Sequence, residues 1–99
     1  MYFIYVSIGN SDDKLSQPEW ARYWRKVNLA IKAIGSHVHF SGLSLPNEPW
    51  QNAMWCVEMG DPNKVLRLRD HLNDARIEFG QESIAWVCVQ GDQTDFIKD

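Results

Sequence analysis

Residues 16–35, SQPEWARYWRKVNLAIKAIG, decide the fold. Apolar side chains recur in this segment every three or four residues, the spacing of one face of an α-helix. Its start has the pattern of a capping box, because Ser16 can accept from the backbone N–H of Glu19 while the Glu19 carboxylate reaches back. Gly35 stands where helices commonly end. The segment is therefore predicted to be a helix with one buried face, formed by Trp20, Tyr23, Trp24, Val27, Ile31 and Ile34.

Strand patterns lie on both sides of this helix, and a second helix follows them. Asp61 and Pro62 form a helix start, an N-cap residue followed by proline in the first turn. Apolar residues then recur at helical spacing up to Phe79, and Gly80 closes the segment. Four stretches rich in β-branched and aromatic residues are predicted to be strands: YFIYVSIG at 2–9, SHVHFSGLSL at 36–45, QNAMWCVEM at 51–59 and ESIAWVCV at 82–89.

The order of these elements is β-α-β-β-α-β, the split βαβ or ferredoxin-like arrangement. Right-handed crossovers place both helices on one face of a four-stranded antiparallel sheet. The chain is thus predicted to be a single α+β domain over residues 1–91, followed by a polar tail at 92–99. The expected strand order is fourth, first, third, second.

The composition excludes several functional classes. The net charge of −3 gives no general attraction to phosphate, so nucleic acid is not an expected partner. No apolar run approaches the roughly 18 residues of a membrane span, and the first residues do not resemble a signal peptide. Two cysteines make no disulfide framework, so a soluble cytoplasmic protein is expected. No cofactor is predicted.

The sheet face opposite the helices is the main candidate site. Alternation along the strands places Ile4, Val6 and their neighbours under the helices, together with Val38 and Phe40 of the second strand. The fourth strand is ambiguous. Small residues suit a helix-covered face, so Trp86 is assigned to the open side. The residues predicted there are Phe3, Tyr5, His37, His39, Met54, Cys56, Glu58 and Trp86.

A sheet face this aromatic is expected to be covered. Four covers remain open: a second copy of the chain, a small-molecule ligand, the C-terminal tail with Phe96 and Ile97, or a foreign protein. The element order and the aromatic open face resemble the dimeric α+β-barrel superfamily. That group includes cofactor-free monooxygenases, haem-degrading enzymes and small isomerases. The resemblance implies a homodimer that encloses a cavity between two sheets, and it implies no particular activity.

Three kinds of chemistry are considered for this face. His37 and His39, with Cys56 or Glu58, have ligand types that suit a metal ion, although H-x-H spacing alone is a weak signal and no metal is assigned. An imidazole can also exchange a proton with Glu58 or Tyr5 beside an apolar wall. Cys56 and Cys88 flank the first strand too far apart for a disulfide, and both are interpreted as small core residues.

Two loops are further candidates, because connections often carry function. Polar groups gather after the first strand at Asn10, Ser11, Asp12 and Asp13. Trp50, next to Pro49, is expected to be an exposed anchor for a partner.

The predicted function is therefore a small binding or interaction module, in one version an inhibitor or sequestering protein. It is expected to form a homodimer and to use the open face together with the loop residues Asn10, Asp12, Asp13 and Trp50. The alternative is an enzyme of the dimeric α+β-barrel type, a cofactor-free oxygenase or isomerase acting on a small apolar or aromatic molecule.

Overall fold

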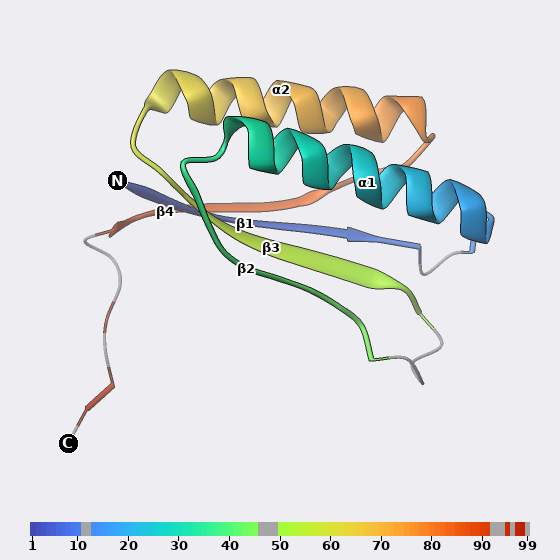
Figure 1. Cartoon of the computed structure of the whole chain (residues 1–99), viewed down its shortest axis with the longest axis horizontal. Coiled ribbons are helices and arrows are strands. Elements are labelled where there is room, and N and C mark those ends of the chain that lie inside the picture. The colour runs from blue at the N-terminus through green and yellow to red at the C-terminus, as the bar shows by residue number, and fades with distance from the viewer. Residues whose placement is uncertain (11–12, 46–49, 92–94, 96, 99) are drawn as a thin grey trace.

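The computed structural model describes residues 1–10, 13–45, 50–91, 95 and 97–98. Two long helices lie side by side across one face of a four-stranded sheet (Figure 1). The element order is the predicted one, and the chain has a ferredoxin-like α+β fold. The elements are β1 Tyr2–Gly9, α1 Gln17–Ile34, β2 His37–Leu43, β3 Asn52–Met59, α2 Pro62–Glu78 and β4 Ala85–Gln90.

The strand order β2-β3-β1-β4 confirms the expected sheet, with β1 and β3 in the centre. All three pairings are antiparallel. Ile4, Val6 and Ile8 of β1 are at most 2% exposed and lie under the helices. Ala53, Trp55, Val57 and Met59 of β3 are equally buried, which confirms the predicted inward sets of the two central strands.

The helix ends form as the sequence predicts. The Glu19 backbone N–H donates to Ser16 Oγ at 3.3 Å, and the Ser16 N–H donates to Glu19 Oε1 at 2.9 Å, which completes the capping box. Asp61 caps α2 through the Asn63 N–H at 2.9 Å. Gly80 has φ +63°, the left-handed conformation that favours glycine after a helix.

Gly35 ends α1 for a different reason from the usual left-handed turn. Its φ of −66° and ψ of 142° are extended and open to any residue. A Cβ at this position would, however, lie 2.6 Å from Val57 Cγ1 and 2.7 Å from the Ile31 carbonyl oxygen. Glycine is required here because the end of the helix passes directly against the sheet.

A polar pair is buried between α1 and the sheet. The indole Nε1–H of Trp55, fully buried, donates to Asn28 Oδ1 at 2.9 Å, and Asn28 is only 9% exposed. The buried face of α1 is therefore not purely apolar, and this hydrogen bond holds the indole of β3 in one orientation beneath the helix.

Replacing Asn28 by alanine is expected to lower the free energy of unfolding by about 1–3 kcal/mol, because the Trp55 N–H is left without an acceptor. Urea denaturation measures the loss. In Trp55→Phe the donor is already gone, so the added cost of Asn28→Ala should be much smaller in that background. Equal costs in the two backgrounds would show that the hydrogen bond contributes nothing.

The second buried polar side chain of α1 is Tyr23, which is 1% exposed. Its ring packs on Phe79, with centroids 5.2 Å apart. Its hydroxyl has no hydrogen-bond partner among the described residues. Burial raises the pKa of Tyr23 to about 12, although the nearby charge of Arg76 acts in the opposite direction. The core thus holds a phenol that resists ionisation.

Strand β2 departs from the predicted alternation. The pairing with β3 shifts between Val38, which faces Val57, and Phe40, which faces Cys56. This β-bulge inserts His39 as an extra residue and moves every later side chain to the opposite face. The prediction that Phe40 lies under the helices is therefore wrong: Phe40 is 53% exposed on the open face.

Candidate functional site: the open sheet face

The face of the sheet opposite the helices, here the open face, consists of three rows that run across the strands in the order β2, β3, β1, β4. The register places side chains of each row next to one another. The histidine row is His37, Glu58, Phe3 and Val89, the middle row is Phe40, Cys56, Tyr5 and Val87, and the small row is Gly42, Met54, Ser7 and Ala85.

The middle row is apolar at both edges of the sheet. Phe40 on β2 is 53% exposed and Val87 on β4 is 52% exposed, while Met54 of the small row beside them is 44% exposed. Between the two edges lie the half-buried ring of Tyr5 and the buried thiol of Cys56. Large apolar side chains at this exposure on three different strands form a continuous patch rather than scattered surface residues.

The histidine row carries the polar groups of the face. The bulge turns the His39 ring onto this row, where its Nε2–H donates to Glu58 Oε1 at 3.1 Å. The ring also lies 5.6 Å from Phe3 and meets His37 edge-on, with centroids 4.5 Å apart. Because a carboxylate can only accept, this bond fixes the proton on Nε2 and leaves Nδ1 of a neutral ring able to accept.

At the other end of the strands, the small row leaves a hollow. Gly42 has nothing within 4 Å of the position that a Cβ would take, and Ser7 and Ala85 are also short. A shallow groove of ≈320 Å³ lies here, with Phe40 and Met54 among its lining residues. The open face is therefore hollow near Gly42 and Ser7, whereas the histidine row at the other end of the strands carries larger side chains.

Tyr5 and Cys56 form the centre of the middle row. They are direct partners in the β1–β3 register. Coulombic interaction with Cys56 raises the pKa of Tyr5, and a hydrogen bond to the same side chain acts in that direction too. Tyr5 thus stays protonated at neutral pH and brings no charge to the centre of the face.

Two residues of β4 do not lie where the sequence predicts them. Trp86 pairs with the buried Val6 and packs against the core on the helix side, so its assignment to the open face is wrong. Val87 takes that position instead. Cys88, interpreted as a core residue, is exposed on edge strand β4, whereas Cys56 is buried as predicted. In the described part of the chain, no three acidic, histidine or cysteine side chains are grouped to hold a metal ion.

The four loop residues predicted to contact a partner differ in how accessible they are. Asn10 is 3% exposed, and its amide is used inside the fold: Nδ2 donates to the Leu15 carbonyl and to Gln51 Oε1, both at 3.0 Å. It is unavailable to a partner, so that prediction is wrong. Asp13 is exposed, with φ 58°, and Asp12 lies outside the described residues. Trp50 is 56% exposed, as expected for an anchor.

Sequence reasoning missed the amide cluster that fixes this end of the molecule. Gln51 exchanges two hydrogen bonds with Gln17 at the start of α1, at 2.8 and 3.0 Å, and Gln51 Oε1 also accepts from Asn10. Glutamines carry no recognisable spacing signal, so nothing in the sequence pointed to this contact. It holds the segment after Trp50 against the helix.

Comparisons with known proteins identify a fold and no family. No family model and no curated protein matches the sequence. A hydroxynitrile lyase from Passiflora edulis is similar in structure, with a TM-score of 0.60 at 12% identity over 95% of this chain and 96% of the other. The de novo designed protein Foldit4 aligns with a TM-score of 0.58 at 8% identity over 90% and 93% of the two chains.

A third similar structure is a dimeric ferredoxin-like protein of unknown function from Thermobifida fusca. Its TM-score is 0.56 at 10% identity, over 90% of each chain. At these identities the likeness concerns the fold alone. The class is thus a small ferredoxin-like α+β protein. None of the helices in the described residues is long and apolar enough to cross a membrane.

Proposed function

We propose that this protein is a small interaction module whose open face binds a second copy of itself. The observation that carries the proposal is the apolar middle row, with Phe40 and Val87 about half exposed at its two ends. Burying such side chains is the main favourable term in protein association. The neutral phenol of Tyr5 at its centre adds no desolvation cost of the kind that a buried charge brings.

The shape of the face supports a second copy as the occupant. A two-fold axis along the middle row sets this row on its counterpart. It also lays the larger side chains of the histidine row of each copy over the small row of the other, where the groove lies. Such an interface uses the same patch on both subunits, as two-fold dimers do. The similar structure from Thermobifida fusca is itself described as dimeric, which supports the same assembly.

The C-terminal tail is a weaker candidate for the cover. Ile97 is fully exposed, so it packs on none of the described residues, and Phe96 lies outside them. Trp50 and Leu45, exposed at the end of the sheet nearest the small row, extend the apolar surface beyond the strands. These two side chains would contact the second copy at the rim of the seam.

Sedimentation equilibrium across a wide concentration range tests the proposal on the unmodified protein. The expected result is a reversible monomer–dimer equilibrium, since the exposed apolar row is short and part of the face is polar. A monomer at every concentration would overturn the proposal. Assembly beyond the dimer would also contradict it, because a closed two-fold interface uses up the open face in both copies.

The His39–Glu58 pair favours a second candidate function, proton transfer on a small apolar or aromatic molecule. The pair resembles a positioned general base, with Glu58 orienting the ring and Nδ1 left to accept a proton. In a face-to-face dimer it would be enclosed between the two sheets, beside Phe3. The similar structure described as a hydroxynitrile lyase supplies a probe reaction of this class.

Mandelonitrile tests the second candidate. A base removes its hydroxyl proton, the bond to the nitrile carbon breaks, and benzaldehyde and cyanide leave, with the proton returned to cyanide. Release of benzaldehyde that is lost in His39→Gln would support an enzyme, with His71→Gln on α2 as the matched control. Equal release by the two variants and by buffer would leave the interaction module as the function.

A further inference from the structure

A groove lies on the other side of the sheet, between α2 and the edge strand β4. It has a volume of ≈430 Å³, within the range of small-molecule sites. The two helices cover β1 and β3 closely but leave the helix side of β4 partly open. Trp86 on β4 and Ile84 just before this strand are accordingly only half buried. The groove is independent of the proposed dimer, which uses the opposite face.

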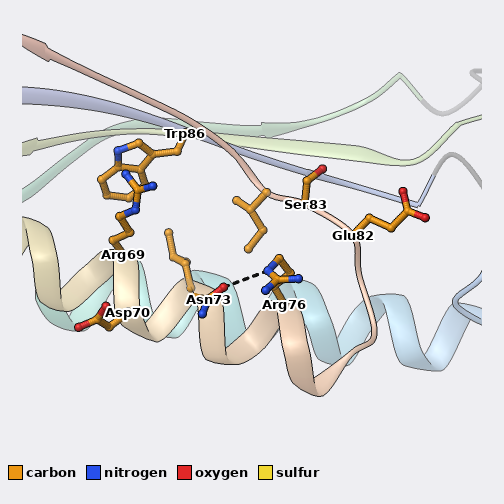
Figure 2. Close-up of a pocket in the computed structure, with 9 residues that line it drawn as sticks. Arg69, Asp70, Asn73, Arg76, Glu82, Ser83 and Trp86 are labelled. Carbon is orange, nitrogen blue, oxygen red and sulfur yellow. Dashed lines mark hydrogen bonds between the residues drawn. The ribbon is translucent and has the colours of Figure 1, made fainter.

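Two arginines of α2 and the Trp86 indole of β4 line this groove. Arg69 and Arg76 are seven residues apart on α2, about two helical turns, and both face β4 (Figure 2). The Arg69 guanidinium carbon lies 5.8 Å from the centre of the Trp86 ring, a cation–π contact. Ser83 and Asn73 add a hydroxyl and an amide to the lining.

The Arg76 guanidinium is fixed in place. Its Nε–H donates to Asn73 Oδ1 at 3.0 Å, and Nη1 donates to the Gln81 carbonyl, also at 3.0 Å. These bonds leave the remaining N–H groups of the planar fork to a ligand. A group already held in one position loses little conformational entropy on binding.

Neither arginine is neutralised by a carboxylate in the described part of the chain. Asp70 and Glu82 also line the groove. Figure 2 shows the Asp70 side chain pointing away from the Trp86 indole, and Glu82 at the opposite end of the groove. Glu82 Oε1 approaches Lys14 Nζ at 3.5 Å. The two acids thus lie toward the two ends of the groove, with Arg76 between them and Arg69 beside the Trp86 indole.

We propose that this groove binds a small organic carboxylate with an aromatic or apolar body. Arg76 would take the carboxylate by charge-assisted hydrogen bonds. Arg69 would add a second positive charge beside the indole, and Leu72, Ile84 and Trp86 would supply an apolar wall. The groove lining holds two arginines and two carboxylates. Because the carboxylates repel a doubly charged phosphate more strongly than a singly charged ligand, we expect the groove to prefer a carboxylate.

Benzoate tests this proposal, with benzamide as its uncharged isostere and inorganic phosphate as the bare ion. The readout is the shift of the Trp86 indole N–H resonance in ¹⁵N-labelled protein, assigned with Trp86→Phe. Benzoate is expected to saturate the shift at millimolar concentration, with benzamide and phosphate at least about tenfold weaker. Equal shifts with benzoate and benzamide, or none with benzoate up to about 10 mM, would overturn the proposal.

Three variants separate the effect of the two groove arginines from the effect of net charge on benzoate binding. Arg69→Gln and Arg76→Gln should each weaken benzoate about tenfold, as expected for the loss of a charged hydrogen-bond donor. Arg67→Gln, exposed on α2 away from the groove, changes the net charge equally and should leave the affinity unchanged. Arg69 is exposed and its variant is expected to fold normally. Equal weakening by Arg67→Gln would assign the effect to general electrostatics and contradict the site.

Discussion

Phe40→Glu is expected to abolish self-association at concentrations where the unmodified protein is dimeric. Phe40 is 53% exposed in the single chain, so the substitution should change the free energy of unfolding of the monomer by less than about 1 kcal/mol. At the seam, however, it removes a large apolar side chain and places two glutamates opposite each other across the two-fold axis. Loss of a large aromatic side chain from an interface can cost about 2 kcal/mol or more, an increase of about thirtyfold in the dissociation constant.

Leu66→Glu is the matched control for this experiment. Leu66 is 60% exposed on α2, on the surface away from the open face, and it receives the same charge. Its variant should sediment like the unmodified protein. If both variants dissociate equally, net charge rather than the open face governs the association. If Phe40→Glu remains dimeric, the middle row is not the seam.

The unmodified protein is expected to lose about 2 kcal/mol of folding free energy between pH 10 and pH 12 through Tyr23 alone. Burial raises the pKa of Tyr23 from 10.0 to about 12 in the folded state. Above pH 10 the unfolded chain releases this proton while the folded chain keeps it. The unfolded state then binds fewer protons, so stability falls as pH rises, and it is unaffected below pH 10.

Tyr23→Phe isolates this contribution. The variant should be as stable as the unmodified protein at pH 7 or more stable by about 1 kcal/mol, because it removes a buried hydroxyl without a partner among the described residues. It should also lose less stability than the unmodified protein above pH 10. Tyr2→Phe, at a half-buried tyrosine of β1, should keep the alkaline loss. Urea denaturation at neutral and alkaline pH measures these differences, and equal alkaline slopes for Tyr23→Phe and the unmodified protein would contradict the account.

The sequence was sufficient for the fold because local signals agreed with one another. The capping box at Ser16, the Asp61–Pro62 start and the apolar faces of both helices each depend on nearby residues. The order of strands and helices then left one common topology. The two central strands were assigned correctly, because one side of each is clearly more apolar than the other.

The candidate site could be predicted only in part, because both edge strands lack such a contrast. In β4 both alternating sets are apolar, and the helices cover this edge incompletely, so a large Trp86 fits the helix side and Val87 faces outward. In β2 the bulge at His39 reverses the alternation of side chains, and the segment HVHFSGL contains no sequence signal that predicts a bulge. His39 and Glu58 could be placed together from the sequence, since they lie on adjacent strands. The groove between Arg69 and Trp86 was missed, because Trp86 was assigned to the opposite face of the sheet.

The most direct test of the open-face dimer is an isotope-filtered NOE experiment on a mixture of labelled and unlabelled protein. The proposed axis brings Val89 of one copy over Ala85 of the other. Within one chain these residues are four positions apart on β4, roughly 13 Å, too far for a methyl–methyl NOE. We expect an intermolecular cross-peak between the methyl groups of Val89 and Ala85. A dimer whose intermolecular cross-peaks come instead from Leu66 and Ile77 on α2 would contradict the open-face dimer.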